Sequence, residues 1–260
     1  MRIVCIGDVM GEPGRKAVRH LLPPLIEREK VDFTVVNGEN VAGGFGFTAE
    51  TLAELFKAGA DVVTGGNHSW DKKDVRDILE REPRLLRPGN YSNAPGKGSV
   101  LATARNGQKV GVVNLMGRVF MHPLDNPFPM AHALLDELRK ETPYLVLDFH
   151  AEASSEKQAM GWHAAGRASV VFGTHTHVQT ADERILPGGT GFITDAGLTG
   201  PLDTVIGMRT DYALERFLTG MPTRLEVGKG NIKLQGIMVD VDEHGHATAI
   251  QRIQESYRPT

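Results

Sequence analysis

The chain has 260 residues, of which 40% are hydrophobic and 23% are charged. This composition is typical of a soluble globular protein and too rich in aliphatic residues for a disordered chain. The formal net charge of −3 argues against binding nucleic acid through bulk positive charge, although a local basic groove stays compatible with it. The single cysteine, Cys5, excludes an intramolecular disulfide and a thiolate metal cluster, so we expect it to pack as a small apolar residue.

Targeting signals are not found in the sequence. The chain begins directly on a strand-like run, without a charged-then-apolar leader, and no apolar stretch approaches the ~18 residues that a membrane helix needs. We therefore expect a cytoplasmic protein with no membrane partner.

In the first part of the chain, short apolar runs alternate with helical patterns. We expect strands at 3–6, 33–36 and 61–63, and helices at 14–29 and 48–57. Pro23 and Pro24 predict a kink or break in the first helix. Thr48 is a suitable N-cap for the second helix, and Thr51 at the third position predicts that no capping box forms.

The same alternation continues to about residue 221 and then changes. We expect strands at 109–114, 144–149 and 169–172 and a helix at 130–140. Two-residue alternation at 223–227 and 233–237 predicts antiparallel strands with one wet face, with turns at 228–230 and 243–245. Because no repeat or linker-like stretch interrupts the pattern, we expect one domain spanning 1–260.

Side chains able to bind metal follow five of the buried strands. Carboxylate, amide and imidazole groups stand at or just after the strand ends: Asp8, Glu39, Asn40, Asn67, His68, His150, His175 and His177. In open α/β sheets this edge is where loops converge and ligands bind. The donor types suit a pair of first-row metal ions better than calcium or an iron–sulfur cluster.

Each of these clusters also has an ordinary structural explanation. Gly7-Asp8 and Asn37-Gly38 are common turn sequences, and Asn67-His68 could lie in a surface loop. His150 alone could be a hydrogen-bonded core histidine. Their recurrence at corresponding strand ends favours a shared site.

The ordered set of motifs makes the chain recognisable. Gly7-Asp8, Asn37-Gly-Glu-Asn40, Gly66-Asn-His68, the lone His150 and Gly173-Thr-His-Thr-His177 resemble the signature of the calcineurin-like metallophosphoesterases. The resemblance is greatest to the YmdB-type branch, extends over essentially the whole chain and is strengthened by the runs at 11–15, 148–153 and 194–201. It implies an α/β fold, a four-layer α-β-β-α sandwich with two mixed sheets, and a dinuclear metal centre.

The resemblance also implies a role for each motif residue. Asp8 and His177 would bind the first metal, Glu39 would bridge both, and the second metal would be held by Asn67, His150 and His175. Two positions depart from the wider superfamily: Met10 stands where Asp-x-His has its histidine, and Glu39 stands where an aspartate is usual. The branch implies that Asn40 replaces the missing imidazole.

The implied activity is hydrolysis of a phosphate diester. Two cations about 3.5–4 Å apart can activate a bridging hydroxide for in-line attack. His68, next to Asn67, is expected to protonate the leaving group or contact the phosphoryl oxygen, and its alternative role is that of a structural loop histidine. The resemblance favours iron, with manganese or zinc also suited to such donors.

The favoured substrates are cyclic nucleotides, in particular 2′,3′-cyclic mononucleotides. The alternatives are a broad phosphomonoesterase or nucleotidase, and a low-turnover regulatory protein that binds a nucleotide or RNA. A nuclease is less favoured, because the chain shows no basic stripe interleaved with aromatic residues. The family makes a homo-oligomer plausible.

Other polar residues receive a supporting or structural interpretation. Asp148 and Asp195 are expected to accept hydrogen bonds from metal-binding imidazoles, and Asp182 has a weaker claim. We expect Trp70 to pack and Asp71 to cap a helix beginning near residue 72. Surface or packing roles are expected for the remaining histidines and for three loop cations: His20, His122, His132, His163, His244, His246, Lys97, Arg118 and Arg209.

Overall fold

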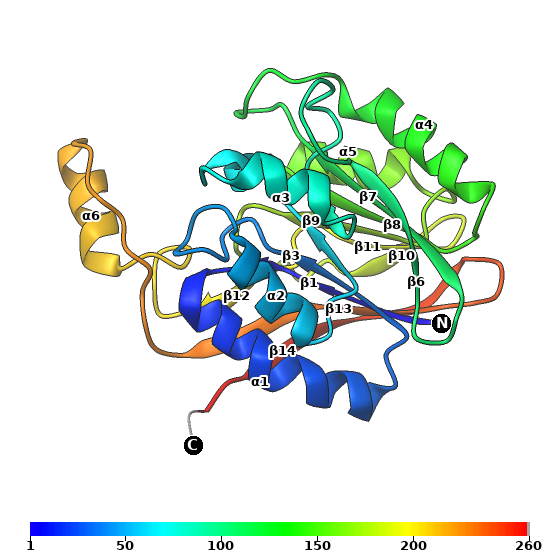
Figure 1. Ribbon diagram of the computed structural model, residues 1–260, viewed down its shortest axis with the longest axis horizontal. Helices are drawn as coiled ribbons and strands as arrows, with labels where there is room; N and C mark the ends of the chain where they lie inside the picture. Colours follow the sequence, from blue (N-terminus) through cyan, green and yellow to red (C-terminus); the bar gives the residue numbers. More distant parts are fainter. Residues whose placement is uncertain (259–260) are drawn as a thin grey trace.

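The computed structural model describes residues 1–258, and within them the strands form two sheets (Figure 1). The first has the order β2-β12-β13-β1-β3-β4-β5, with β14 also paired to β13. Its strands are β1 (Arg2–Ile6), β2 (Asp8–Val9), β3 (Phe33–Asn37), β4 (Val62–Thr64), β5 (Leu85–Leu86), β12 (Leu198–Pro201), β13 (Ile232–Val241) and β14 (Ala247–Ser256). Because β1 runs parallel to β3 and antiparallel to β13, this sheet is mixed.

The second sheet has the order β10-β11-β9-β8-β7-β6. Its strands are β6 (Ser99–Thr103), β7 (Lys109–Met116), β8 (Leu145–His150), β9 (Val170–Thr174), β10 (Arg184–Leu186) and β11 (Thr190–Ile193). Parallel pairing from β7 to β11 gives way to antiparallel pairing at both edges, so this sheet is also mixed.

Helices cover the outer face of each sheet (Figure 1). The helices are α1 (Gly11–Glu29), α2 (Ala49–Lys57), α3 (Val75–Arg81), α4 (Pro127–Arg139), α5 (Ser154–His163) and α6 (Thr210–Thr219), with a 3₁₀ turn η1 (Asn67–Trp70). No helix of residues 1–258 combines the length and the apolar composition needed to cross a membrane.

The side-chain alternation of β1 explains the layering. Val4 and Ile6 pack toward α1 and α2, while Ile3 and Cys5 pack between the two sheets. A third apolar layer lies between the second sheet and helices α4 and α5. The four-layer sandwich with two mixed sheets is therefore confirmed, as is the apolar packing of Cys5.

The expected break in the first helix is wrong. Helix α1 continues without interruption through Pro23 and Pro24. Both prolines are exposed, and so are Arg19 and His20, whose carbonyls lose their helical partners. Water can therefore satisfy the freed carbonyls, while the opposite side of the helix stays packed on the sheet.

The prediction that no capping box forms at α2 is also wrong. The Thr51 amide donates to Thr48 Oγ1 at 3.3 Å, and the Thr48 amide donates to Thr51 Oγ1 at 2.9 Å. The hydroxyl of Thr51 thus replaces the glutamate or glutamine usual at this position.

The predicted strand at 223–227 does not form. Only Val227 makes an isolated bridge, to Met208, and the segment lies beside α6 instead of along a sheet edge. Its Leu225 packs into a small cluster with Met10 and Leu198, which accounts for the apolar alternation. The expected wet face at 233–237 is wrong too, because Gln235 is buried. The hairpin turn near 243–245 is confirmed between β13 and β14.

Candidate metal centre

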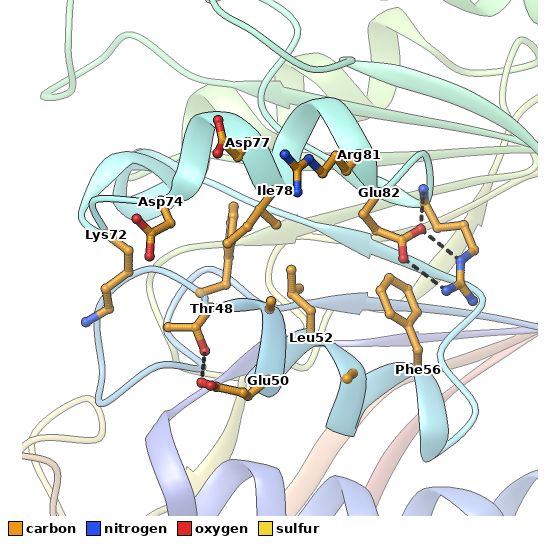
Figure 2. Close-up of a pocket in the computed structure, with 14 residues that line it drawn as sticks. Thr48, Glu50, Leu52, Phe56, Lys72, Asp74, Asp77, Ile78, Arg81 and Glu82 are labelled. Atoms are coloured by element: carbon orange, nitrogen blue, oxygen red, sulfur yellow. Dashed lines mark hydrogen bonds and ion pairs between the residues drawn. The ribbon is translucent and has the colours of Figure 1, made fainter.

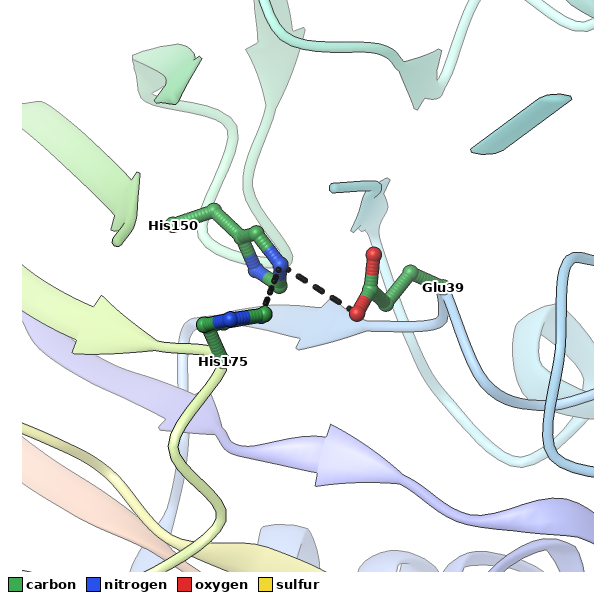
Figure 3. Close-up of side chains that lie close together, drawn as sticks. All are labelled: Glu39, His150 and His175. Atoms are coloured by element: carbon green, nitrogen blue, oxygen red, sulfur yellow. Dashed lines mark hydrogen bonds and ion pairs between the residues drawn. The ribbon is translucent and has the colours of Figure 1, made fainter. Parts of the chain in front are cut away.

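Strand ends from both sheets converge on one buried cluster. Two sets of side chains place a ligand atom of each member within 4.8 Å of the others: Glu39, His150 and His175, and Asp8, Glu39 and His177. Glu39 belongs to both sets, and Figure 3 shows its carboxylate facing His150. Motif residues that are far apart in the sequence, from Asp8 to His177, thus meet at one place.

The first set centres on Nε2 of His150. This atom lies 3.2 Å from Glu39 Oε1, 2.9 Å from Asn67 Oδ1 and 3.1 Å from His175 Nδ1. Two nitrogens and two oxygens from these four side chains therefore lie close together. The structure places Asn67 in this set, as the sequence predicted.

The second set surrounds Asp8, whose Oδ1 lies 3.8 Å from His177 Nε2. Its Oδ2 accepts a hydrogen bond from the His175 amide, whereas Oδ1 is buried without a partner in the described chain. Asn40 repeats this arrangement: Nδ2 donates to the Gly44 carbonyl at 2.9 Å, and Oδ1 has no partner among residues 1–258. Buried oxygens without donors are costly, and a cation could satisfy both.

Each imidazole has its other nitrogen already occupied. His150 Nδ1 lies 2.9 Å from Thr174 Oγ1, which donates to Asp148. His175 Nε2 lies 3.0 Å from Glu152, and His177 Nδ1 donates to the Ile206 carbonyl at 2.8 Å. Such partners fix the tautomer and orientation of a metal-binding ring.

The loop bearing two histidines is backbone-strained. His175 has φ 93° and His177 has φ 62°, in the left-handed region that costs energy for residues other than glycine. Thr176 between them is held by Asp195, whose Oδ2 accepts from its amide at 3.2 Å and from its hydroxyl at 2.6 Å. Lys157 also bonds both residues. These positive φ values accompany the direction of both imidazoles toward the cluster.

The cluster favours positive charge. Burial raises the pKa of the Asp8 carboxyl. Burial also opposes ionisation of Glu39, but the neighbouring His150 and His68 outweigh it and lower its pKa to about 2. For His150, burial opposes protonation, while Glu39 and Asp8 outweigh it and raise the pKa to about 9. Burial and the adjacent His150 lower the pKa of His175 to about 3. The buried carboxylates thus hold a proton on His150, and a metal ion could replace this positive charge once the ring is deprotonated.

Space for the cluster depends on Gly66. A Cβ at this position would lie 2.2 Å from Glu39 Oε2 and 2.4 Å from His150 Nε2. Its φ of −162° is extended backbone, so conformational freedom is not the reason for glycine here. Glycine is required because the chain entering η1 passes too close to the Glu39 carboxylate for a Cβ atom.

His68 stands at the edge of this cluster. Its amide donates to Glu39 Oε2 at 3.0 Å, and its ring Nδ1 lies 2.7 Å from Asp71 Oδ2. The ring packs edge-on against Phe45, with centroids 5.0 Å apart. Donation from Nδ1 to Asp71 leaves Nε2 as the atom available to a bound molecule.

Several supporting roles differ from the sequence expectations. Within residues 1–258, neither Asp148 nor Asp195 bonds an imidazole directly: the Thr174 hydroxyl stands between Asp148 and His150, and Asp195 bonds Thr176 and Lys157. Asp71 bonds His68 and does not cap a helix, since α3 begins only at Val75. Trp70 packs against Tyr91 as expected of a packing residue.

Two contributors were missed by the sequence reasoning. Glu152, which contacts His175, could have been found from the spacing His150-x-Glu152, because this spacing places it two residues beyond the end of β8. Lys157 gave no signal, because a lysine in a helix is ordinarily a surface residue.

The histidines assigned to packing are placed accordingly. His132 and His163 stack on each other with centroids 3.7 Å apart, between α4 and α5. His20 stacks on Tyr257, and His244 and His246 lie at the β13–β14 turn. Among the loop cations, Arg209 pairs with Asp211 and Glu226. Asp182 bonds Thr180 and Thr194 instead of an imidazole.

Comparison with known proteins adds the family. The model of the YmdB-like proteins matches residues 4–253. The chain belongs to the YmdB-like family. Over 255 residues it is 49% identical to the 2′,3′-cyclic-nucleotide 2′-phosphodiesterase of Bacillus subtilis, covering 97% of this chain and 96% of that protein.

Solved structures agree with the assignment. A crystal structure described as a novel phosphatase from Mycoplasma pneumoniae superposes with a TM-score of 0.91 at 32% identity, covering 98% of this chain and 93% of that one. A 5′-nucleotidase precursor from Thermus thermophilus has a TM-score of 0.57 at 12% identity, with 98% of this chain and 54% of that one covered. The latter likeness shows that the YmdB-like chain shares its fold with the nucleotidase.

Proposed function

We propose that this YmdB-like protein is a phosphodiesterase that hydrolyses cyclic nucleotides, with 2′,3′-cyclic mononucleotides as the favoured substrates. The observation that carries the proposal is the pair of ligand sets sharing Glu39 in a buried cluster. The activity named for the Bacillus subtilis relative, at 49% identity, supports the substrate class. The phosphatase description of the Mycoplasma structure is consistent with phosphate-ester chemistry.

Two metal ions are the proposed cofactors, with iron favoured and manganese or zinc as alternatives. The residues fit such a pair, because Asp8 and Asn40 each bury a side-chain oxygen that has no donor among residues 1–258, and three imidazoles have their second ring nitrogens held by other groups. We assign Asp8, Asn40 and His177 to one ion, Asn67, His150 and His175 to the other, and Glu39 to both. When bound, the ions would supply Lewis acidity toward the phosphoryl oxygen and a water ionised near neutral pH.

The chain itself contributes orientation and proton transfer. His68 stands beside the cluster with Nε2 free and Nδ1 directed to Asp71, so we assign it to exchange a proton with the leaving oxygen or to contact the phosphoryl group. Its amide steadies Glu39 independently of the side chain. Because the site takes side chains from both sheets, we also propose that 1–260 act as one domain.

A substrate panel tests the proposal. The metal content of freshly purified protein is measured, and hydrolysis of 2′,3′-cyclic AMP, bis(p-nitrophenyl) phosphate and p-nitrophenyl phosphate is followed before and after chelation. We expect close to two transition-metal ions per chain, hydrolysis of the diesters, loss of activity on chelation and recovery with manganese or iron. Full activity without metal would overturn the mechanism.

The same panel separates the alternatives. Faster hydrolysis of the monoester would identify a broad phosphomonoesterase or nucleotidase. Binding of 2′,3′-cyclic AMP to the metal-loaded protein without turnover would identify a regulatory nucleotide- or RNA-binding protein.

A further inference from the structure

A tight turn at residues 205–208 follows β12. The Val205 amide donates to the Met208 carbonyl at 3.0 Å, and the Met208 amide donates to the Val205 carbonyl at 2.9 Å. Both central residues have positive φ, 48° for Ile206 and 92° for Gly207, as in a type I′ turn. Such a turn favours asparagine followed by glycine, and a β-branched residue at positive φ is strained. Isoleucine is therefore an unfavourable residue at position 206.

The surrounding structure holds this turn in place. The Gly207 amide donates to Thr204 Oγ1 at 3.0 Å, and Thr204 Oγ1 donates to the Pro201 carbonyl at 2.6 Å. Met208 is buried in a cluster with Met10, and a Cβ at position 207 would lie only 2.7 Å from Met10 Cγ. Because its neighbours are fixed in this way, the residue at position 206 cannot relax to a negative φ.

Ile206 contacts a residue assigned to the metal centre. Its carbonyl accepts from His177 Nδ1 at 2.8 Å, so the Ile206 side chain begins two bonds away from an atom that holds a metal-binding ring. Within residues 1–258 it is the only β-branched residue with positive φ, and it is 53% exposed. Asparagine or glycine would present the same carbonyl with less strain. The carbonyl therefore does not account for the isoleucine, and a reason has to lie in its side chain.

Apolar side chains continue from this turn to the His68 side of the centre. Phe45 packs against the cluster that contains Met208 of the turn. The ring of Phe45 also lies edge-on to His68, with centroids 5.0 Å apart. An apolar surface thus extends from the turn that bonds His177 to the ring expected to contact the substrate.

A groove of about 700 Å³ lies between α2 and α3 (Figure 2). Its lining includes Leu52, Phe56 and Ile78, and none of its lining residues is assigned to the metal centre. A nucleotide seated in this groove would not bring its phosphate to the proposed metal ligands. We therefore assign recognition of the base to residues beside the centre itself.

We propose that Ile206 is a specificity-determining residue whose side chain packs against the base of a cyclic nucleotide held at the metal centre. This inference rests on the proposed function. The charged phosphate of such a substrate belongs at the metal ligands, whereas the base is a flat ring that gains from contact with an apolar side chain. The strained turn holds that side chain rigidly beside His177.

Ile206→Asn separates backbone strain from recognition of the base. It introduces the residue preferred in this turn, so the midpoint of thermal unfolding should rise by roughly 2–4 °C. The carbonyl that bonds His177 is retained, so the metal content from elemental analysis should not change. Loss of the apolar contact should raise KM for 2′,3′-cyclic AMP by roughly 5–10-fold, with kcat nearly unchanged. A purely structural residue would not combine greater stability with a higher KM.

A second substrate and two further variants control the result. Methyl ribofuranoside 2,3-cyclic phosphate has no base, so its KM should be the same for Ile206→Asn and the unaltered protein. Ile206→Leu keeps an apolar side chain and should retain the KM for 2′,3′-cyclic AMP. Ile185→Asn removes another exposed isoleucine, on the edge strand β10 of the second sheet, and should also leave this KM unchanged.

Three results would overturn the inference and leave the proposed function standing. An unchanged KM for 2′,3′-cyclic AMP in Ile206→Asn would make Ile206 a strained turn residue only. Equal increases in KM for both esters would place its contact away from the base. A changed sedimentation coefficient with unchanged KM would assign the exposed side chain to a contact between copies of the chain. Failure of the unaltered protein to hydrolyse either ester would instead overturn the proposed function and this inference together.

Discussion

The ammonium group of Lys157 lies 2.6 Å from Oδ2 of Asp195, and both side chains are almost completely buried. The same Asp195 oxygen accepts hydrogen bonds from the amide and hydroxyl of Thr176. Since Thr176 stands between two histidines with positive φ, the ion pair fixes the backbone that presents both imidazoles. This is a positioning role, one step removed from the proposed metal ligands.

Lys157→Met should therefore weaken metal binding as well as stability. Removing one partner leaves the Asp195 charge buried, a change that typically costs ~3–5 kcal/mol. The free energy of unfolding from urea titration and the metal affinity from titration with Mn²⁺ are the two measurements. Lys157→Met/Asp195→Leu removes the uncompensated charge together with the oxygen that accepts from the Thr176 amide, so stability should return in part while metal affinity stays low. Recovery of metal affinity in step with stability would show a purely structural pair.

His68→Ala should separate turnover from metal binding. The backbone amide that bonds Glu39 is retained in this variant, so metal content should stay near normal. Loss of a proton donor or phosphoryl contact should lower turnover of 2′,3′-cyclic AMP by roughly 10²–10⁴-fold. His122→Ala, in an exposed loop, is the matched control and should keep full activity. Metal loss parallel to the activity loss would make His68 a ligand or structural support.

Gly66→Ala tests the close approach of η1 to the cluster. The added methyl group would overlap Glu39 Oε2 and His150 Nε2, so we expect the metal content measured by elemental analysis to fall sharply. Gly107→Ala is the control, because its Cβ would meet nothing within 4 Å and only its positive φ opposes it. Normal metal content in Gly66→Ala would mean that these side chains lie elsewhere when metal is bound.

The convergence of the strand-end motifs was predictable because parallel strands deliver their C-terminal ends to one edge. Asp8, Glu39 and His150 required only the strand pattern and the nature of each donor. The partners behind them were harder to predict, because threonines are inconspicuous in sequence: Thr174 links the Asp148 carboxylate to His150, and Thr176 ties the backbone between His175 and His177 to Asp195. Their role depends on tertiary distances that no local pattern encodes.

The errors in secondary structure have a common cause. Rules based on local sequence assign each residue a fixed free-energy cost in a helix or strand, whereas the actual cost depends on the tertiary surroundings of that residue. Pro23 and Pro24 are tolerated in α1 because the carbonyls they free face solvent. The alternation around Leu225 reflects contact with the Met10 cluster and not with a neighbouring strand. Periodicity identifies a half-buried segment but not the element that covers it.

The shared position of Glu39 gives the last prediction. A carboxylate between two cations offsets their mutual repulsion, so its removal should weaken both sites together. Glu39→Ala should therefore bind little metal. Asn40 offers one oxygen, beside Asp8 in the proposed assignment, and Asn40→Ala should retain about one ion per chain with weak activity.

Elemental analysis of the two variants distinguishes a bridging role from a general loss of structure. Both residues lie on the loop after β3, so damage to the backbone there would affect the two variants alike. Glu39→Gln adds a stricter control, because its amide oxygen can still accept from the His68 amide while the negative charge is lost. Its metal content should fall as in Glu39→Ala. Equal metal loss in Glu39→Ala and Asn40→Ala would contradict the division between the ions, and normal metal content in Glu39→Ala would contradict the bridge itself.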